Sequence, residues 1–335
     1  MKRSFEITSF CSPNQAGVSL IELMVAVTIG AILIFGATQV YVDSRKTYET
    51  SEIVARLQET ARYAIAVIEP DVRMSNYWGL VKGSGVIANQ ASASEAPGGG
   101  PDNCGINHAR DLLTNLEGTN NSYSLSCDAY GAGAVESADT LTVRRAATTI
   151  AAATAGTLQI CSTRMMGRLF SDGGPCTAAP AGQVNDLIVN TYYVDRDSVQ
   201  QEDAPALRRW SLAAGPSFSS QEIIPGVEDM QIQFGIDTTG TSAIASRYVN
   251  PGSLPTGAQI VAVRIWILVR AENPEVGFID GRVYEYGDRI GEKNGNCNTA
   301  DLNATDAATC AYAPADSFRR LLVSRTIQIR NAIGT

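Results

Sequence analysis

The chain has 335 residues, of which 44% are hydrophobic and 18% are charged, and this composition excludes wholesale disorder. Its net charge is -8, and a surface this acidic disfavours nucleic-acid binding through bulk electrostatics. The length allows one large domain or two modest ones.

The first segment of the chain has the polarity of a leader followed by a membrane helix. Residues 1–17 are polar and carry Lys2 and Arg3, whereas residues 18–42 are apolar with Glu22 as their only charge. About 20 apolar residues span a bilayer core, so residues 18–42 are predicted to cross a membrane once. The basic leader favours a cytoplasmic start, which leaves the bulk of the chain on the far side.

The order of these two parts is the reverse of an ordinary secretory signal, whose apolar region precedes its cleavage site. Here Gly17 ends the polar part, and the apolar run VSLIEL begins at Val18. This arrangement resembles the type IV pilin family, whose prepilin peptidase cuts after such a glycine. The family usually has Phe where this chain has Val18. The resemblance implies cleavage between Gly17 and Val18, N-methylation of Val18, and retention of the helix for assembly.

Glu22 is the fifth residue of the mature chain that this cleavage would create. A carboxylate inside a membrane helix costs roughly 2.5–3.5 kcal/mol, so it usually has a partner. One candidate is the α-amino group of a neighbouring subunit's first residue, and the alternative is that Glu22 snorkels to the nearby interface. Gly30 and Gly36 either permit close helix packing or local melting, or are simply tolerated.

An amphipathic stretch follows the apolar run and predicts that one helix continues to about residue 75. Pro70 is expected to bend or interrupt this helix, because proline lacks the backbone donor. Asn76, Trp78 and Gly79 are expected to end it. Apolar residues recur at three- and four-residue spacing and predict a stripe that packs on a head domain: Val54, Leu57, Ala61, Ala64, Ile65, Ile68 and Val72.

Three further segments resemble the PilW family of minor pilins. Residues 71–79 (DVRMSNYWG) resemble its D-(I/V)-R-x-A-G-Y-x-G helix exit, with Ser75 and Asn76 in place of Ala and Gly. Residues 261–271 (VAVRIWILVRA) resemble its V-R-(V/I)-W-L-L-V-R-(S/A) strand, and residues 318–331 resemble its closing strand. These segments lie at both ends of the head and in its middle.

The remainder predicts a β-rich head. Residues 80–135 are rich in Gly, Ala, Ser and Asn and are expected to form a surface excursion. Strands are predicted at 141–143, 157–160, 186–194, 207–212, 227–236, 260–269 and 321–330. The expected fold is α+β and pilin-like: a long N-terminal helix, transmembrane in its first half, packed on an antiparallel sheet with long disulfide-bearing loops. Its predicted parts are a leader (1–17), a transmembrane helix (18–42), an amphipathic continuation (43–78) and a periplasmic head (79–335).

Seven cysteines occur, and Cys11 lies in the predicted leader. The six of the mature chain fit an oxidising compartment and three disulfides: Cys104, Cys127, Cys161, Cys176, Cys297 and Cys310. No pair has the CxxC spacing of zinc or thioredoxin-like sites. We favour pairing between neighbours along the chain, because each such pair brackets a loop containing Gly, Asn or Pro. The other connectivities stay open.

Catalysis is not expected. The single histidine, His108, lies in a loop beside Cys104 and is predicted to be exposed to solvent. Nucleophile, zinc-protease and phosphate-loop motifs are absent. Glu228 and Asp229 fall on opposite faces of a predicted strand and do not make a carboxylate pair. The adjacent arginines, such as Arg144 and Arg145, are split in the same way, which indicates structural or solvated roles.

A loop near the C-terminus has oxygen side chains at the close spacing that calcium uses: Asn294, Asn296, Asn298 and Asp301. It lacks the glycine and glutamate of an EF-hand, so an Asn-rich turn closed by Cys297 and Cys310 is the better interpretation. We expect no metal and no cofactor.

The PilW resemblance implies a low-abundance pilin that waits in the inner membrane with its head in the periplasm. It would enter the pilus beside other minor and major pilins after processing by prepilin peptidase, and would prime assembly, with the large head favouring a tip position. Twitching motility and cell adhesion would follow from having a pilus, and no direct nucleic-acid partner is expected. The alternatives are a type II secretion minor pseudopilin similar to GspJ, and a tip adhesin whose loops bind a surface ligand.

Overall fold

The structure is a computed structural model, and it describes residues 17–91, 104–176, 182–215, 217–240, 243–291, 298–303 and 309–332. The chain divides into two compact units, Met1–Glu52 and Ile53–Thr335, which we treat separately. One helix, α1 (Leu20–Arg73), runs through the first unit and provides the first residues of the second. We call the second unit the head.

The observed helix agrees with the predicted one except at Pro70, which does not interrupt it. Helix α1 continues three residues beyond Pro70 to Arg73, and the Met74 amide donates to the Pro70 carbonyl at 3.1 Å. Proline removes a single donor near the helix end, where few intrahelical bonds follow. Ile68 and Val72 are fully buried on either side of it, so packing holds the last turn in place.

Helix α1 ends where the sequence predicts, through two residues in the left-handed region. Asn76 has φ 62° and Gly79 has φ 82°. The Asn76 amide donates to the Asn331 carbonyl at 2.8 Å, and the Trp78 indole donates to the Asn76 Oδ1 atom at 2.9 Å. A Cβ at Gly79 would lie 2.5 Å from the Ser162 hydroxyl. Both this close approach and the positive φ therefore require glycine at position 79.

The head contains two larger sheets, whereas the sequence predicted one. The first has eight strands: β1 (Ile87–Ala88), β2 (Leu116–Thr119), β3 (Thr140–Ala146), β4 (Ala155–Ser162), β5 (Gly167–Asp172), β6 (Gln183–Asp195), β7 (Ala206–Ala213) and β8 (Ser217–Pro225). Their order is β1-β5-β4-β6-β3-β2, with β7 joined to β6 and β8 to β7. All these pairs are antiparallel except β1 with β5.

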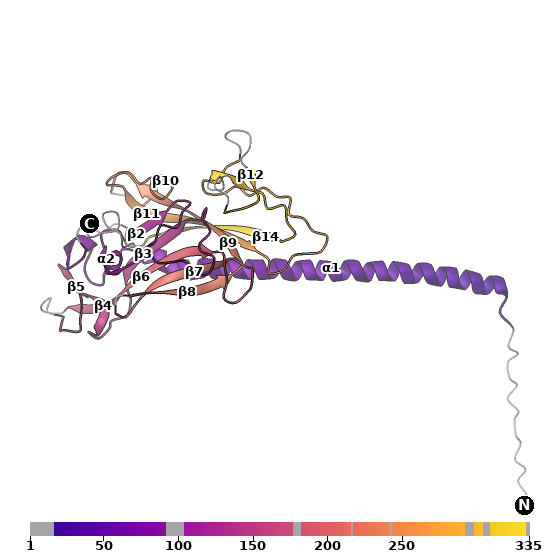
Figure 1. Cartoon of the computed structure of the whole chain (residues 1–335), viewed down its shortest axis with the longest axis horizontal. Coiled ribbons are helices and arrows are strands. Elements are labelled where there is room, and N and C mark those ends of the chain that lie inside the picture. The colour runs from indigo at the N-terminus through magenta and orange to yellow at the C-terminus, as the bar shows by residue number, and fades with distance from the viewer. Residues whose placement is uncertain are drawn as a thin grey trace, which may run out of the picture. The chain divides into compact units, whose positions relative to one another are not determined.

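The second sheet is antiparallel throughout and has the order β10-β9-β11-β14. Its strands are β9 (Val227–Asp237), β10 (Arg247–Val249), β11 (Gln259–Arg270) and β14 (Arg320–Gln328). A short parallel pair, β12 (Asn298–Thr299) with β13 (Ala311–Tyr312), and two short helices, η1 (Ser84–Val86) and α2 (Ile106–Arg110), complete the described elements. Figure 1 shows β9, β11 and β14 beside the strands of the larger sheet.

These elements confirm the predicted α+β class, and each of the seven predicted strands is present. The sequence did not predict the strands that are short or polar, which are β1, β2, β5, β8, β10, β12 and β13. The β8 segment SFSSQEIIP has exposed and half-buried residues in alternation and contains three serines, so it carries little apolar signal.

The head part of α1 lies in a core that both sheets share. Its buried stripe, which confirms the predicted one from Leu57 onward, consists of Leu57, Ala61, Ala64, Ile68 and Val72. The stripe packs in one cluster with Tyr192 of β6 and with Val263 and Ile265 of β11. Val54 was assigned to the same stripe, but its side chain is exposed.

A second core occupies the region expected to be a surface excursion, and that prediction was wrong for much of it. Val81, Ile87, Ala109 and Leu112 of this region are buried in one cluster with Trp78 and with apolar residues of β3, β4, β5 and β6. The Gly- and Ala-rich composition hid these few large side chains. Residues 92–103 of the excursion lie outside the described residues.

Candidate assembly helix and its support in the head

The predicted cleavage site lies directly before α1. Gly17 and Val18 precede the helix, and the Val18 side chain is exposed. The Leu23 amide donates to the Ser19 carbonyl at 3.1 Å, and the Ser19 amide donates to the Glu22 carboxylate at 3.4 Å. This is half of a capping box, in which a carboxylate satisfies a backbone donor at the helix start. A carboxylate has about four acceptor positions, so Glu22 keeps the capacity to bind a second donor.

The first turns of α1 expose nearly all of their apolar side chains. Among the described residues, α1 is the one helix long and apolar enough to cross a membrane, and none of its most apolar window is buried within the chain. The large exposed side chains are Leu20, Ile21, Leu23, Met24, Val25, Val27, Ile29, Ile32, Leu33, Ile34, Phe35, Val40, Tyr41 and Val42. This surface requires a cover of lipid or of other apolar helices.

The two threonine hydroxyls of this stretch are satisfied within the helix. The Thr28 hydroxyl donates to the Met24 and Val25 carbonyls at 3.0 and 2.9 Å, and the Thr38 hydroxyl donates to the Ile34 carbonyl at 2.7 Å. A helix that satisfies its own polar groups is suited to a lipid environment. A Cβ at Gly30 or Gly36 would meet nothing within 4 Å, so packing inside the chain does not require either glycine.

Asp71 fixes the C-terminal turns of α1 to the larger sheet. Its Oδ1 atom accepts from the Arg145 Nε and Nη2 atoms at 3.0 and 2.7 Å. Its Oδ2 atom accepts from the Asn190 amide at 2.6 Å and from the Tyr192 hydroxyl at 2.7 Å. Burial, together with the Asp71 charge, raises the pKa of Tyr192 and keeps it protonated as a donor. The sequence analysis quoted Asp71 as part of a resemblance and did not predict this network.

Two disulfides lie in the head, and both match the favoured pairing of neighbours. Cys104 is bonded to Cys127, and Cys161 is bonded to Cys176. Cys310 is also disulfide-bonded, but its expected partner Cys297 lies outside the described residues, so that pair stays a prediction.

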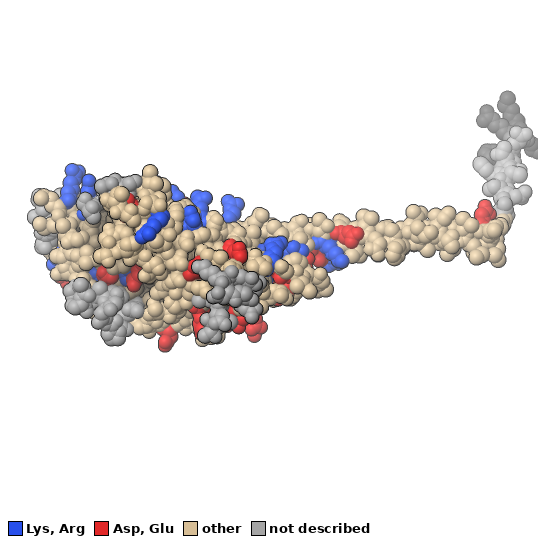
Figure 2. All heavy atoms as spheres, turned by 90° about the horizontal axis from the view of Figure 1, so that it is seen from above, with Lys and Arg blue, Asp and Glu red and all other residues tan. Residues whose placement is uncertain are grey.

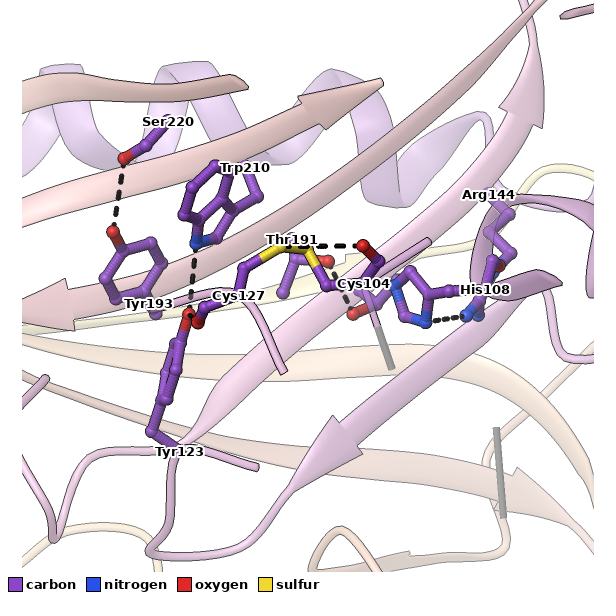
Figure 3. Close-up of a disulfide and its surroundings, with 10 residues drawn as sticks. Cys104, His108, Tyr123, Cys127, Arg144, Thr191, Tyr193, Trp210 and Ser220 are labelled. Carbon is purple, nitrogen blue, oxygen red and sulfur yellow. Dashed lines mark hydrogen bonds between the residues drawn. A yellow bond between two sulfur atoms is a disulfide. The ribbon is translucent and has the colours of Figure 1, made fainter. Parts of the chain in front are cut away.

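Aromatic side chains secure the loop that ends at Cys127 (Figure 3). The Tyr123 hydroxyl donates to the Cys127 carbonyl at 2.6 Å and accepts from the Trp210 indole at 3.0 Å. The Tyr123 and Tyr193 rings pack with their centroids 5.2 Å apart. The disulfide therefore joins a loop that β6 and β7 already hold through aromatic contacts.

His108 is buried, so the prediction of a solvent-exposed histidine was wrong. It lies in α2, and its Nδ1 atom accepts from the Arg144 guanidinium at 3.0 Å, as Figure 3 shows. Burial and the Arg144 charge lower the His108 pKa to about 3, so the ring is neutral at pH 7. Its potential nucleophile, Cys104, is occupied in a disulfide.

The buried carboxylates of Glu228 and Asp229 bind different arginines. Asp229 accepts from the Arg289 Nε atom at 2.6 Å, and neither side chain is exposed. Glu228 accepts from the Arg320 Nη2 atom at 2.9 Å. Glu228 and Asp229 therefore serve separate ion pairs and do not form the paired site that acid–base catalysis uses.

The predicted oxygen-rich loop is described only in part. Asn294 and Asn296 lie outside the described residues. The Asp301 carboxylate accepts from the Asn303 amide at 2.8 Å, which is the pattern of a local turn. Within the described ranges, no three His, Cys, Asp or Glu side chains gather as a metal site would require.

Two ranges of the chain match models of known protein families. Residues 12–38 match the profile of the prokaryotic N-terminal methylation motif, a range that contains Gly17, Val18 and Glu22. Residues 191–331 match the family described as Type IV Pilus-assembly protein W, and this range runs from β6 through β14. The chain thus joins a segment that matches the N-terminal methylation motif to one that matches the PilW family, and the predicted resemblance to PilW-like type IV pilins is confirmed.

Other comparisons add less. No curated protein matches the chain. A type IV-like pilin from Thermus thermophilus is a structural neighbour, with 14% sequence identity and a TM-score of 0.36 over 83% of this chain and 98% of that one.

Proposed function

We propose that this protein is a minor pilin that takes part in priming and assembling a type IV pilus. The observation that supports this most strongly is the exposed apolar stretch of α1, with a single carboxylate at its start, in a chain that also carries a PilW-type head. Such a helix has to be covered by lipid before assembly and by other pilin helices afterwards. The PilW match favours the pilus over a type II secretion pseudopilus.

Processing would remove a leader (1–17) and leave a transmembrane helix (18–42), its amphipathic continuation (43–78) and a β-rich periplasmic region (79–335). Prepilin peptidase would cut between Gly17 and Val18 and leave a methylated, positively charged amine on Val18. Glu22 of one subunit would bind the Val18 amine of its neighbour and fix the axial register of the two helices. Desolvated charges depend strongly on such pairing, because an unpaired carboxylate in lipid is costly.

The head would reside in the periplasm before assembly, with the protein held in the inner membrane by α1. Its disulfides support this placement, since they persist in oxidising compartments. A tip position is supported by the size of the head, which contains two larger sheets and two large core clusters. A head of this size would be difficult to repeat along a filament.

The test is an in-frame deletion of the gene in its native host, with surface pili counted by electron microscopy. The proposal expects a loss of pili that wild-type protein restores, and gold label on an epitope-tagged head at filament ends. Normal piliation in the deletion strain would contradict the priming role, and label spread evenly along the filaments would contradict the tip position.

A further inference from the structure

Strand β14 ends the four-stranded sheet, and its free edge can be assigned residue by residue. At one end of its pairing with β11, the Ala271 amide donates to the Arg319 carbonyl at 2.8 Å. At the other end, the Ile329 amide donates to the Val261 carbonyl at 3.0 Å. The register between these two bonds has no shift. Odd-numbered residues of β14 therefore bond to β11, and even-numbered residues direct their backbone groups away from the sheet.

The even-numbered backbone groups are covered only at the far end of this edge. The Arg330 amide donates to the Arg73 carbonyl of α1 at 3.0 Å. For Leu322, Ser324 and Thr326, the described part of the chain supplies no backbone bond on that side. Ser324 and Thr326 are exposed, as is Arg325 between them. Within the described residues, a stretch of the β14 edge therefore has no backbone partner.

This edge lacks the proline, the lysine and the irregular register that often protect an edge strand from pairing. The other long edge, β8, ends in Pro225, and its register with β7 shifts between Leu207 and Arg208. Strand β14 has neither a proline nor a lysine, and it pairs regularly over nine residues. The β14 edge is therefore less protected against pairing than the β8 edge.

Arginines flank the open edge on both faces of the sheet. Arg325 lies on the face toward α1, half exposed and 3.7 Å from Glu69. Arg264, which pairs with Thr326 across the ladder, lies on the opposite face with its guanidinium 3.9 Å from the centroid of the Tyr248 ring. Within the described residues, Arg264 forms no ion pair with a carboxylate. A second copy pairing at this edge would bring like charges together, whereas an acidic strand would neutralise them.

We propose that the β14 edge accepts an extended, acidic strand from the head of another pilin subunit. The strand would bond to the backbone of Leu322, Ser324 and Thr326 and place carboxylates beside Arg264 and Arg325. Figure 2 shows basic side chains mainly along one margin of the head and acidic side chains mainly along the opposite margin. This inference rests on the proposed function, because it requires other pilins as partners.

The test places a photo-crosslinking amino acid at position 324 of the full chain in piliated cells, and in a second strain at position 32. Ile32 is exposed on the apolar part of α1, so it reports pilin association independently of the edge. Crosslinked peptides are sequenced by mass spectrometry. The inference expects position 324 to join a strand segment of another pilin head that contains at least two Asp or Glu residues.

Matched variants measure the backbone contribution, with a crosslinker at Thr326 as the probe. Ser324→Pro removes the outward amide without removing a bond to β11, and Ser324→Ala keeps that amide. We expect the proline to lower the crosslink yield about tenfold, the effect of about one hydrogen bond, and the alanine to leave it unchanged. Arg325→Glu is also expected to lower the crosslink yield, because it replaces a positive charge beside the edge with a negative one.

The outcomes separate the two proposals. Crosslinks from position 32 to pilins without strand crosslinks from position 324 would overturn the edge inference and leave the proposed function intact. Crosslinks from neither position would overturn both. Equal yields for the proline and alanine variants would show that the contact does not use the backbone edge, and would also overturn the inference.

Discussion

The two parts of helix α1 have the same secondary structure and opposite surroundings. Up to Glu52 the helix belongs to one compact unit, and its apolar side chains are exposed. From Ile53 to Arg73 it belongs to the head, where Leu57, Ala61 and Ile68 are buried. The first part thus presents an apolar surface that other molecules must cover, and the second uses its apolar stripe to build the core. Substitutions should therefore affect assembly in the first part and stability in the second.

The largest effect is expected at Glu22. In Glu22→Gln the amide oxygen can still accept from the Ser19 amide, so the helix cap is kept and only the charge is lost. Loss of a buried ion pair costs about 3–5 kcal/mol, so incorporation of the protein into pili should fall by at least about a hundredfold. Quantitative immunoblots of sheared pili measure how much of the protein is incorporated.

Glu59→Gln is the matched control, because Glu59 is an exposed carboxylate farther along the same helix. It should leave incorporation unchanged. Normal incorporation of the Glu22→Gln protein would show that the charge at this position has no part in assembly.

A comparable loss, in stability rather than assembly, is expected for Asp71→Ala. The substitution leaves Arg145 without its carboxylate and removes the acceptor of Asn190 and Tyr192. The free energy of unfolding should fall by about 3–5 kcal/mol, measured by urea unfolding of the full chain in detergent. The exposed-site change Glu59→Ala should stay within about 0.5 kcal/mol. A small effect at Asp71 would mean that packing alone fixes the helix to the sheet.

Removal of the Cys104–Cys127 bond should have the next largest effect. The bond closes a loop with a sequence separation of 23 residues, and the double variant Cys104→Ser, Cys127→Ser should lose about 3 kcal/mol of unfolding free energy. Tyr123 and Trp210 should keep the loop near β7 even without the bond. Amide hydrogen exchange of residues 119–127 tests this, and exchange as fast as in the unfolded chain would contradict it.

The smallest of these effects is a pH dependence that originates at His108. Its pKa is about 3 in the folded chain and about 6.5 when unfolded, so the unfolded state binds more protons between these values. The contribution of His108 to stability should therefore fall as the pH drops below about 6.5, by about 2 kcal/mol between pH 7 and pH 5. Urea unfolding at the two pH values measures it.

The variant His108→Gln isolates this contribution, because it cannot titrate and its side-chain oxygen can still accept from Arg144. Burial raises the Asp195 pKa to about 6, which gives a slope of opposite sign in both proteins and cancels in their difference. Identical pH profiles for the two proteins would refute the role of His108.

The sequence predicted α1 and the long strands because their signals are local. Helix α1 has a membrane-length apolar run followed by apolar residues at helical spacing, and strands such as β11 are rich in β-branched side chains. The candidate assembly residues, Gly17, Val18 and Glu22, could be named for the same reason, since leader, cleavage glycine and carboxylate adjoin one another.

The interior of the head could not be predicted in the same way, because its contacts join distant segments. Asp71 meets Arg145 across 74 residues, and Arg144 meets His108 across 36 residues. Strand alternation indicated structural or solvated roles for these arginines, but it could not name their partners. His108 was assigned to the surface for a similar reason: the loop around it is small and polar, and the cover that buries it comes from other strands.

The central claim is that this chain is a processed pilin, and the N-terminal mass of the protein from its native membrane tests it most directly. The account predicts a mature N-terminus at methylated Val18 in cells with prepilin peptidase, an uncleaved chain in cells without it, and oxidised cysteines in the mature form. An intact Met1 terminus, or cleavage elsewhere, in cells with an active peptidase would contradict the account and make residues 18–42 an ordinary membrane anchor.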